Sequence, residues 1–275
     1  MKRHEFLKLS GLTALASALS TQSVFSALFR SKPLNTNPMK TVYHAAESRG
    51  HANHGWLKTW HTFSFAGYYD PARIHFGTLR VLNDDEVAGG MGFGTHPHDN
   101  MEIITIPLSG ALKHRDSMGN EGIIRAGEIQ VMSAGTGIQH SEFNGDAAEA
   151  CRLLQIWLFP REKQVRPRYD QLAFDVAERQ DRWQQILSPN PEDAGVWIHQ
   201  DAWFHLIEAS AGSSHTYTLK KPGNGLYFFI IEGEAQVEQQ SLKRRDALGM
   251  TDANGFTFTT KSGTYALLME IPMHV

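Results

Sequence analysis

His96-Pro97-His98 and His140-Ser141-Glu142 are the two short stretches from which the fold and the site are predicted. In each stretch the two functional side chains are two residues apart. On a β-strand this spacing directs both side chains to one face of the sheet. Two such strands lying side by side would bring three imidazoles and one carboxylate to a single point. The sequence therefore predicts a β-structure with one shared polar site.

The predicted site has the donor set of a transition-metal centre. Its members are His96, His98, His140 and Glu142. Three neutral nitrogen donors and one anionic oxygen donor suit a divalent transition metal, and they leave one or two coordination positions open for catalysis. We therefore expect one divalent transition metal ion as cofactor, with iron favoured and manganese, cobalt, nickel, copper or zinc as the alternatives.

The composition fits a soluble globular protein. The 275 residues are 41% hydrophobic and 20% charged, with a formal net charge of −3. Because basic residues are not in excess, general binding to nucleic acid or to anionic membranes is not expected. The single cysteine, Cys151, excludes an intramolecular disulfide and is expected to be a small buried apolar residue. We expect a monomer without a stable membrane anchor.

Residues 1–33 differ in composition from the rest of the chain and are interpreted as a signal peptide or N-terminal extension. A positively charged start is followed by an apolar stretch rich in small residues, from Leu9 to Ala27. The run Arg3-His4-Glu5-Phe6-Leu7-Lys8 is similar to a twin-arginine export signal, with His4 in place of the second arginine. We expect export to the periplasm. The alternative is a cytoplasmic protein with a disordered or surface-helical extension.

From Thr41 onward, short apolar runs alternate with glycine, asparagine and aspartate, which predicts strands and turns. Two successive β-rich halves of similar size indicate a duplicated barrel or sandwich. We expect a metal-binding domain at 41–160 and, at 161–275, a linker followed by a second domain. The second half is expected to bind no metal, because its histidines lack the paired spacing. They are His199, His205, His215 and His274.

The two stretches, taken with the glycines around them, resemble the two cupin motifs. In the first motif the matching residues are Gly90, His96, His98, Glu102 and Gly110. In the second motif they are Gly127, Ser133, Gly135, His140 and Asn144, with serine in place of the usual proline. A His-x-Glu pair at 140–142 replaces the usual lone histidine of the second motif. This combination is similar to the pirin family, whose members are two-cupin proteins.

The similarity to pirins extends beyond the motifs and covers about residues 41 to 275. The stretches that look like those of bacterial pirin-like quercetin 2,3-dioxygenases are 50–57, 60–65, 92–98 and 132–142. The segment Asp99-Asn100-Met101-Glu102 departs from the Arg-Gly-Phe-Glu common elsewhere in the family. The resemblance implies an all-β fold of two tandem cupin (jelly-roll) barrels.

The resemblance also implies that the metal ligands are His96, His98, His140 and Glu142. Glu102 is the alternative carboxylate, because its equivalent is a ligand in single-cupin relatives. An even offset from His98 would place Glu102 on the same strand face. Glu142 is preferred because its strand neighbour His140 fixes its position. Glu102 is then expected to orient an imidazole or to hold a water molecule.

A flavonol such as quercetin, together with O2, is the substrate that the resemblance implies. The expected reaction is a dioxygenation that opens the ring and releases carbon monoxide. The metal would lower the pKa of a bound enolic hydroxyl, and Glu142 would take its proton. Phe63, Phe65 and Phe93 are candidates for stacking on the flat substrate.

Two alternatives to this enzyme stay open at this stage. One is a metal-dependent binding or redox-sensing pirin-like protein without significant turnover, for which an export signal is unfavourable. The other is a metal-bound cupin that acts on another small oxygenated substrate.

Overall fold

The computed structural model describes residues 38–275, and most of this part of the chain is strand. The predicted signal peptide, residues 1–33, lies outside the described residues, so export stays a prediction. Among residues 38–275, no helix is long and apolar enough to cross a membrane. The helices described there are two short 3-10 helices, η1 (Ala46–Ser48) and η2 (Val176–Arg179).

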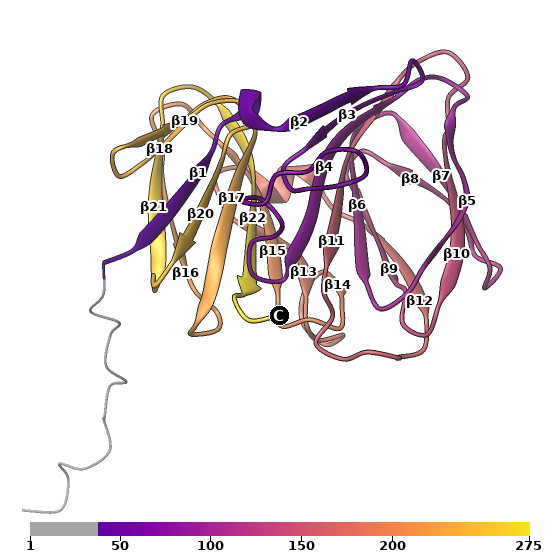
Figure 1. Cartoon of the computed structure of the whole chain (residues 1–275). Coiled ribbons are helices and arrows are strands. Elements are labelled where there is room, and N and C mark those ends of the chain that lie inside the picture. The colour runs from indigo at the N-terminus through magenta and orange to yellow at the C-terminus, as the bar shows by residue number, and fades with distance from the viewer. Residues whose placement is uncertain (1–37) are drawn as a thin grey trace, which may run out of the picture. The chain divides into compact units, whose positions relative to one another are not determined.

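The strands form four sheets that make up two barrels (Figure 1). This arrangement confirms the predicted all-β fold of two tandem cupin barrels. The first barrel has a seven-stranded sheet, in the order β12-β9-β6-β11-β4-β3-β2, and a four-stranded sheet, in the order β5-β10-β7-β8. The strands of the larger sheet are β2 (Gly50–Asn53), β3 (Leu57–His61), β4 (Leu79–Val87), β6 (Glu102–Ser109), β9 (Glu128–Ser133), β11 (Cys151–Leu158) and β12 (Arg168–Ala173). Those of the smaller sheet are β5 (Gly92–His98), β7 (Ala111–Asp116), β8 (Glu121–Arg125) and β10 (Ile138–Asn144).

The second barrel repeats this plan with a seven-stranded sheet, in the order β1-β20-β17-β22-β15-β13-β14, and a four-stranded sheet, in the order β16-β21-β18-β19. The strands of the larger sheet are β1 (Lys40–His44), β13 (Gln184–Ser188), β14 (Val196–Trp197), β15 (Trp203–Ala209), β17 (Asn224–Glu232), β20 (Ala247–Thr251) and β22 (Thr264–Pro272). Those of the smaller sheet are β16 (Ser214–Thr218), β18 (Ala235–Val237), β19 (Gln240–Leu242) and β21 (Gly255–Thr260).

Two strands belong to the barrel opposite to the one predicted from their place in the sequence. β1 pairs with β20 of the second barrel, although residue 41 is the predicted start of the first domain. β12 pairs with β9 of the first barrel, although it follows the predicted boundary at residue 160. Each of these strands covers the edge of a sheet that would otherwise expose unpaired backbone groups. The domain prediction of 41–160 and 161–275 therefore differs from the sheets at these two segments.

The largest apolar core lies between the two barrels. It is built from outward-facing side chains of both seven-stranded sheets, so each barrel buries one sheet face against the other. From the first barrel it includes Leu82, Ile104, Ile106, Ile156 and Leu158, and from the second Phe204, Leu206, Tyr227, Phe229 and Leu267. Since fully burying one such side chain is favourable by about 1.5–3 kcal/mol, this layer supplies a large share of the hydrophobic stabilisation.

The interiors of the two barrels differ in polarity. The second barrel is filled by one large apolar cluster that includes Phe228, Phe256 and Phe258. The first barrel holds two small apolar clusters, and Cys151 is a buried member of one of them, as predicted. The remaining interior of the first barrel is lined by polar side chains, and this is where the predicted metal ligands lie.

Asn144, at the end of β10, fixes the strand that carries two of these ligands. Its amide nitrogen donates to the backbone oxygen of Val87 at 2.9 Å and to that of Glu149 at 2.8 Å. Because Val87 ends β4 of the facing sheet, these bonds hold the two sheets of the first barrel together. The asparagine of the second cupin motif thus has a structural role here.

We predict that Asn144→Ala lowers the free energy of unfolding by about 2–4 kcal/mol, because the buried carbonyl of Val87 and the partly buried carbonyl of Glu149 both lose their donor. Urea denaturation of the mutant and wild type measures this change. Asn190→Ala is the matched control, since Asn190 is exposed and its side chain accepts one bond from the backbone of Glu192 at 2.9 Å. Equal effects of the two substitutions would contradict the role of Asn144.

The buried side chain of His205 should make the stability of the folded protein depend on pH. Burial lowers the pKa of this histidine to about 3, and Lys220 acts in the same direction while Asp193 opposes it. The folded state therefore disfavours the proton that the unfolded chain accepts near pH 6.5, so stability falls as the pH drops below that value. Between pH 7 and pH 4 this loss is about 3 kcal/mol. Denaturation series of wild type and His205→Gln should differ by this amount, and parallel pH profiles would contradict it.

Candidate metal centre

The two predicted histidine strands lie side by side. β5 pairs with β10 antiparallel, so that His96 is opposite His140 and His98 is opposite Ile138. A register shift between His140 and Glu142 marks a bulge in β10. β5 is an edge strand of its sheet, which is where a residue without a backbone N–H, such as Pro97, is tolerated. The spacing therefore predicted the pairing of the two strands.

Three imidazole nitrogens converge between these strands. His140 Nε2 lies 3.0 Å from His98 Nε2 and 3.0 Å from His96 Nε2. Ligand atoms of the three histidines all lie within 4.8 Å of one another. Two nitrogen ligands at about 2.1 Å from one ion and at right angles are about 3.0 Å apart. The three histidines thus fit a single divalent metal ion.

The surroundings of His98 and His140 favour the neutral form that a metal requires. Burial, followed by the neighbouring imidazoles, lowers the pKa of His98 to about 4 and that of His140 to about 2. His96 Nδ1 lies 2.8 Å from the backbone oxygen of Gly94, to which it donates. This bond fixes the tautomer of His96 that leaves Nε2 free as a ligand.

Glu142 is fully buried beside His140 but belongs to a second group. Its carboxylate accepts bonds from Thr105 Oγ1 at 3.4 Å and from Gln155 Nε2 at 3.0 Å. Burial raises the pKa of Glu142 to about 7. Among the described residues, its carboxylate groups with His140 and His114 and not with all three of the other predicted ligands. The structure thus brings the three histidines together and places the carboxylate next to them.

His114 is a site residue that the sequence reasoning missed. It lies on β7, directly opposite Glu142 of β10. Its Nε2 is 3.3 Å from Asp116 Oδ2, and its ring stacks on Tyr169 with the centroids 4.7 Å apart. The pair His114-Arg115-Asp116 has the same two-residue spacing as the recognised pairs, so the signal was present in the sequence.

Glu102 faces away from the metal centre, so the prediction that it orients an imidazole of the site was wrong. Its carboxylate accepts a bond from Ser133 Oγ at 2.7 Å. It lies on β6 of the seven-stranded sheet, on the same face as Ile104 and Ile106 of the core between the barrels. The even offset from His98 fails because the chain turns between the two residues, where Asn100 has φ 46°.

A cavity of about 440 Å³ opens beside the three histidines. Its apolar wall contains four aromatic side chains, which are Trp56, Phe65, Phe93 and Trp157. Phe65 and Phe93 were predicted, whereas Phe63 is buried in the core between the barrels and does not line the cavity. Trp157 packs edge-on against His98 with the ring centroids 4.9 Å apart. The cavity can therefore enclose a flat molecule next to the metal position.

Polar side chains of the seven-stranded sheet also line this cavity. Those that line it are Thr59, His61, Asn83, Asp85 and Gln155. They lie on adjacent strands, where Thr59 is opposite Asp85 and His61 is opposite Asn83. Since residues two apart share a strand face, β3 and β4 each contribute two of them. These residues belong to no sequence motif. The only signal for them in the sequence was that residues two apart on a strand share one face.

Asp85 is the member of this polar lining with an open hydrogen-bonding position. It is buried and bonded by Thr59, while its Oδ1 has no hydrogen-bond partner among the described residues. Burial raises the pKa of Asp85 to about 7. A buried polar atom without a partner that lines a cavity is available to a ligand.

Comparison with known proteins assigns the chain to a family. Residues 42–158 match the Pirin family model, and residues 185–271 match the model of the quercetinase C-terminal cupin domain. A quercetin 2,3-dioxygenase of Escherichia coli K12 is 42% identical over 231 residues, which are 82% of this chain and 96% of that protein. A pirin-like protein of Caulobacter vibrioides is 40% identical over 222 residues, 80% of this chain and 95% of that protein.

Solved structures agree with this assignment. The crystal structure of YhhW from Escherichia coli superposes with a TM-score of 0.81 at 39% identity, covering 86% of this chain and all of that one. A second structure of that bacterial pirin, in complex with nickel(II), gives a TM-score of 0.80. Since relatives above 40% identity span nearly their full length, and both halves of the chain match family models, this chain belongs to the pirin family.

Proposed function

We propose that this chain is a metal-dependent quercetin 2,3-dioxygenase, which opens the central ring of a flavonol with O2 and releases carbon monoxide. In this reaction both atoms of O2 enter the organic product, and one ring carbon leaves as carbon monoxide. The observation that carries the proposal is the convergence of three imidazoles, of which His96 and His98 line a cavity that also has aromatic side chains in its lining. The relative named quercetin 2,3-dioxygenase, at 42% identity, supports it.

The cavity suits a flavonol in size and in the nature of its walls. Its volume of about 440 Å³ is within the usual range for small-molecule sites. The aromatic wall formed by Trp56, Phe65, Phe93 and Trp157 offers stacking faces to a planar ring system. The polar side chains of the lining, such as Asn83, Asp85 and Gln155, offer hydrogen-bond partners to ring hydroxyls. A purely aliphatic substrate would leave these polar groups without partners.

His96, His98 and His140 would hold the divalent ion, with Glu142 as the fourth ligand or as the base beside it. When bound, a divalent ion supplies positive charge that favours the deprotonated form of an enolic hydroxyl. Glu142 would accept that proton, and Thr105 and Gln155 donate to its two carboxylate oxygens. A carboxyl group whose pKa lies near the working pH is suited to general base catalysis.

The first test measures metal content and O2 uptake with quercetin. We predict that His140→Ala loses the metal and lowers kcat/KM at least about a hundredfold, because His140 lies between the other two histidines. Elemental analysis, an oxygen electrode and carbon monoxide detection on the anaerobically purified full chain give the three readouts. Glu102→Gln is the matched control, since Glu102 is buried but faces the other barrel.

Either of two results would overturn this proposal. A protein with full metal occupancy and no O2 uptake, under any of the metals iron, manganese, cobalt, nickel or copper, would favour a binding or sensing role. Loss of metal in Glu102→Gln would contradict the assignment of ligands.

The polar lining gives a second prediction. In Asp85→Asn one carboxylate oxygen becomes a donor, so a substrate hydroxyl loses its acceptor and KM for quercetin rises about tenfold with metal content unchanged. For 3-hydroxyflavone, which lacks the hydroxyls of the outer rings, KM should change little. Steady-state kinetics with both flavonols tests this difference. Asp193→Asn, an exposed site in the second barrel, is the control. Equal changes for the two substrates would exclude Asp85 from substrate recognition.

A further inference from the structure

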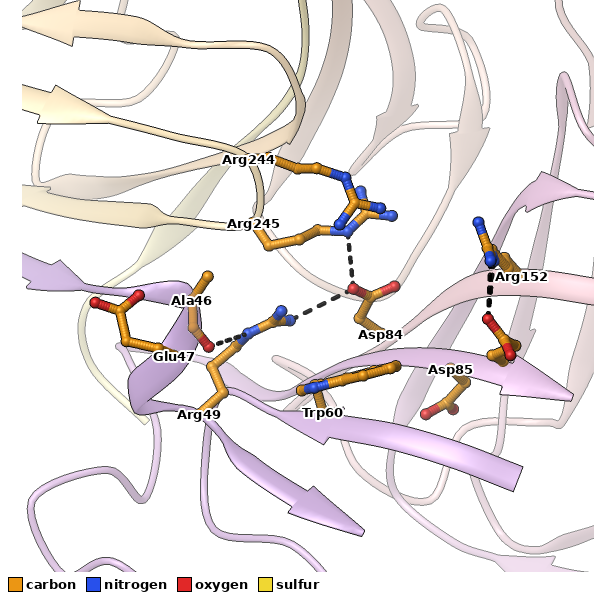
Figure 2. Close-up of a pocket in the computed structure, with 10 residues that line it drawn as sticks. Ala46, Glu47, Arg49, Trp60, Asp84, Asp85, Arg152, Arg244 and Arg245 are labelled. Atoms are coloured by element: carbon orange, nitrogen blue, oxygen red, sulfur yellow. Dashed lines mark hydrogen bonds and ion pairs between the residues drawn. The ribbon is translucent and has the colours of Figure 1, made fainter. Parts of the chain in front are cut away.

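A second cavity, of about 390 Å³, lies where the two barrels meet, and it is rich in arginine. Figure 2 shows its lining residues, which come from both barrels. The first barrel and the segment that leads into it contribute Arg49, Trp60, Asp84 and Arg152. The second barrel contributes Arg244 and Arg245, from the turn that precedes β20. None of the three converging histidines lines this cavity, and among the described residues Asp85 is the one in the lining of both cavities.

Three arginines of this cavity share two carboxylates. Asp84 is shared by two guanidinium groups, with Oδ2 at 2.8 Å from Arg245 Nε and 3.6 Å from Arg49 Nη1. Glu232 is the second nearby carboxylate, at 2.7 Å from Arg244 Nε and 3.8 Å from Arg245 Nη2. Each of these carboxylates therefore contacts two guanidinium groups.

The other acids of the lining make no ion pair with these three arginines in the part of the chain that the structure describes. Glu86 is paired with Lys58 at 2.7 Å and with Arg152 at 3.0 Å. In Figure 2 the side chains of Glu47 and Asp85 point away from the three converging arginines. Arg49, Arg244 and Arg245 therefore share the carboxylates of Asp84 and Glu232.

Two of these arginines are buried with open donor positions. The side chains of Arg49 and Arg245 are each only 5% exposed. Arg49 Nη1 and Arg245 Nε have no partner of hydrogen-bond geometry among the described residues, although both are ion-paired with Asp84. Burying a charged donor without a full set of partners is unfavourable, and a bound anion that accepts from both would remove this cost.

Arg245 also has a backbone conformation that residues other than glycine rarely adopt. Arg245 has φ 69°, a left-handed conformation that favours glycine. Its N–H donates to the backbone oxygen of Ile230 at 2.6 Å, so the turn is fixed to β17. The turn thus holds the guanidinium of Arg245 at the junction of the barrels beside Asp84.

We propose that this cavity binds a phosphate group, held by Arg49, Arg244 and Arg245. Three guanidinium groups arriving from different elements match an anion with several acceptor oxygens, and arginine binds phosphate with two parallel hydrogen bonds. The volume of about 390 Å³ leaves room beside Trp60 for the organic part of a small phosphorylated molecule. The site is independent of the dioxygenase proposal, since it uses none of the residues of the metal centre.

The test is calorimetric titration of the metal-loaded full chain with inorganic phosphate, at an ionic strength held constant with chloride. We expect saturable binding in the range of about 1 mM or tighter, and a thermal midpoint that rises with phosphate concentration. Arg245→Gln and Arg49→Gln should weaken binding about tenfold or more. If these buried variants fail to fold, Arg244→Gln, at a side chain that is 53% exposed, should still weaken binding severalfold.

Three controls make the outcome decisive. Arg115→Gln removes an exposed arginine that is paired with Glu121 at 2.9 Å, and it should leave phosphate binding unchanged. His140→Ala should bind phosphate as wild type does, whereas its loss of binding would place the anion at the metal centre and overturn the proposal. Succinate of equal concentration should bind more weakly. Absence of saturable phosphate binding, equal binding of succinate, or no effect of Arg244→Gln would each overturn the site.

Discussion

The packing of the two seven-stranded sheets against each other is the constraint on which the rest of the structure depends. Each barrel presents one whole sheet face to the other, and the apolar side chains between them form the largest core. Because this layer supplies burial that lies outside the first barrel, the interior of that barrel is free to hold polar groups. A single small barrel with so many buried polar side chains would have little apolar surface left to offset its conformational entropy.

Strand β4 has one face toward the second barrel and one face toward the interior of the first barrel. Leu82 and Asp84 face the second barrel, where one joins the apolar core and the other is paired with Arg245. Asn83 and Asp85 face the interior, where both line the cavity beside the histidines. The alternation of a strand thus separates a structural face from a chemical face at every second residue. The two cavities share this strand, with Asp84 in the lining of one and Asp85 in the lining of both.

The convergence of the three histidines was the part of the candidate site that the sequence made predictable. The spacing of His96 and His98 on one strand, with His140 on a paired strand, was sufficient for this, whereas Glu142 lies beyond a register shift and groups with His114 and His140. Glu102 was ambiguous because the same argument needs an unbroken strand, and a turn at Asn100 sends it to the opposite sheet face. The predicted domain boundaries differ at β1 and β12 because the pairing of an edge strand depends on contacts distant in sequence.

The polar side chains that line the cavity beside the histidines could not be predicted in the same way. Thr59, Asn83, Asp85 and Gln155 come from three strands, and each one alone is an ordinary polar residue of a sheet. Their common role exists only once the register sets Thr59 opposite Asp85 and Gln155 opposite Asn83. The same holds for Phe63, which shares its sequence context with Phe65 but packs into the core between the barrels.

The contrast between the two barrel interiors explains why the candidate metal centre lies in the first barrel. In the second barrel, Phe228, Phe256 and Phe258 pack with ring centroids 4.9–6.2 Å apart and fill the space that the first barrel leaves as a cavity. An interior filled with aromatic rings stabilises its barrel but excludes ligands. The interior of the first barrel lacks such a large apolar cluster, and the apolar layer between the two barrels supplies hydrophobic burial in its place. The buried carboxyl groups of Asp85 and Glu142, whose pKa values burial raises to about 7, are the direct chemical consequence of this exchange.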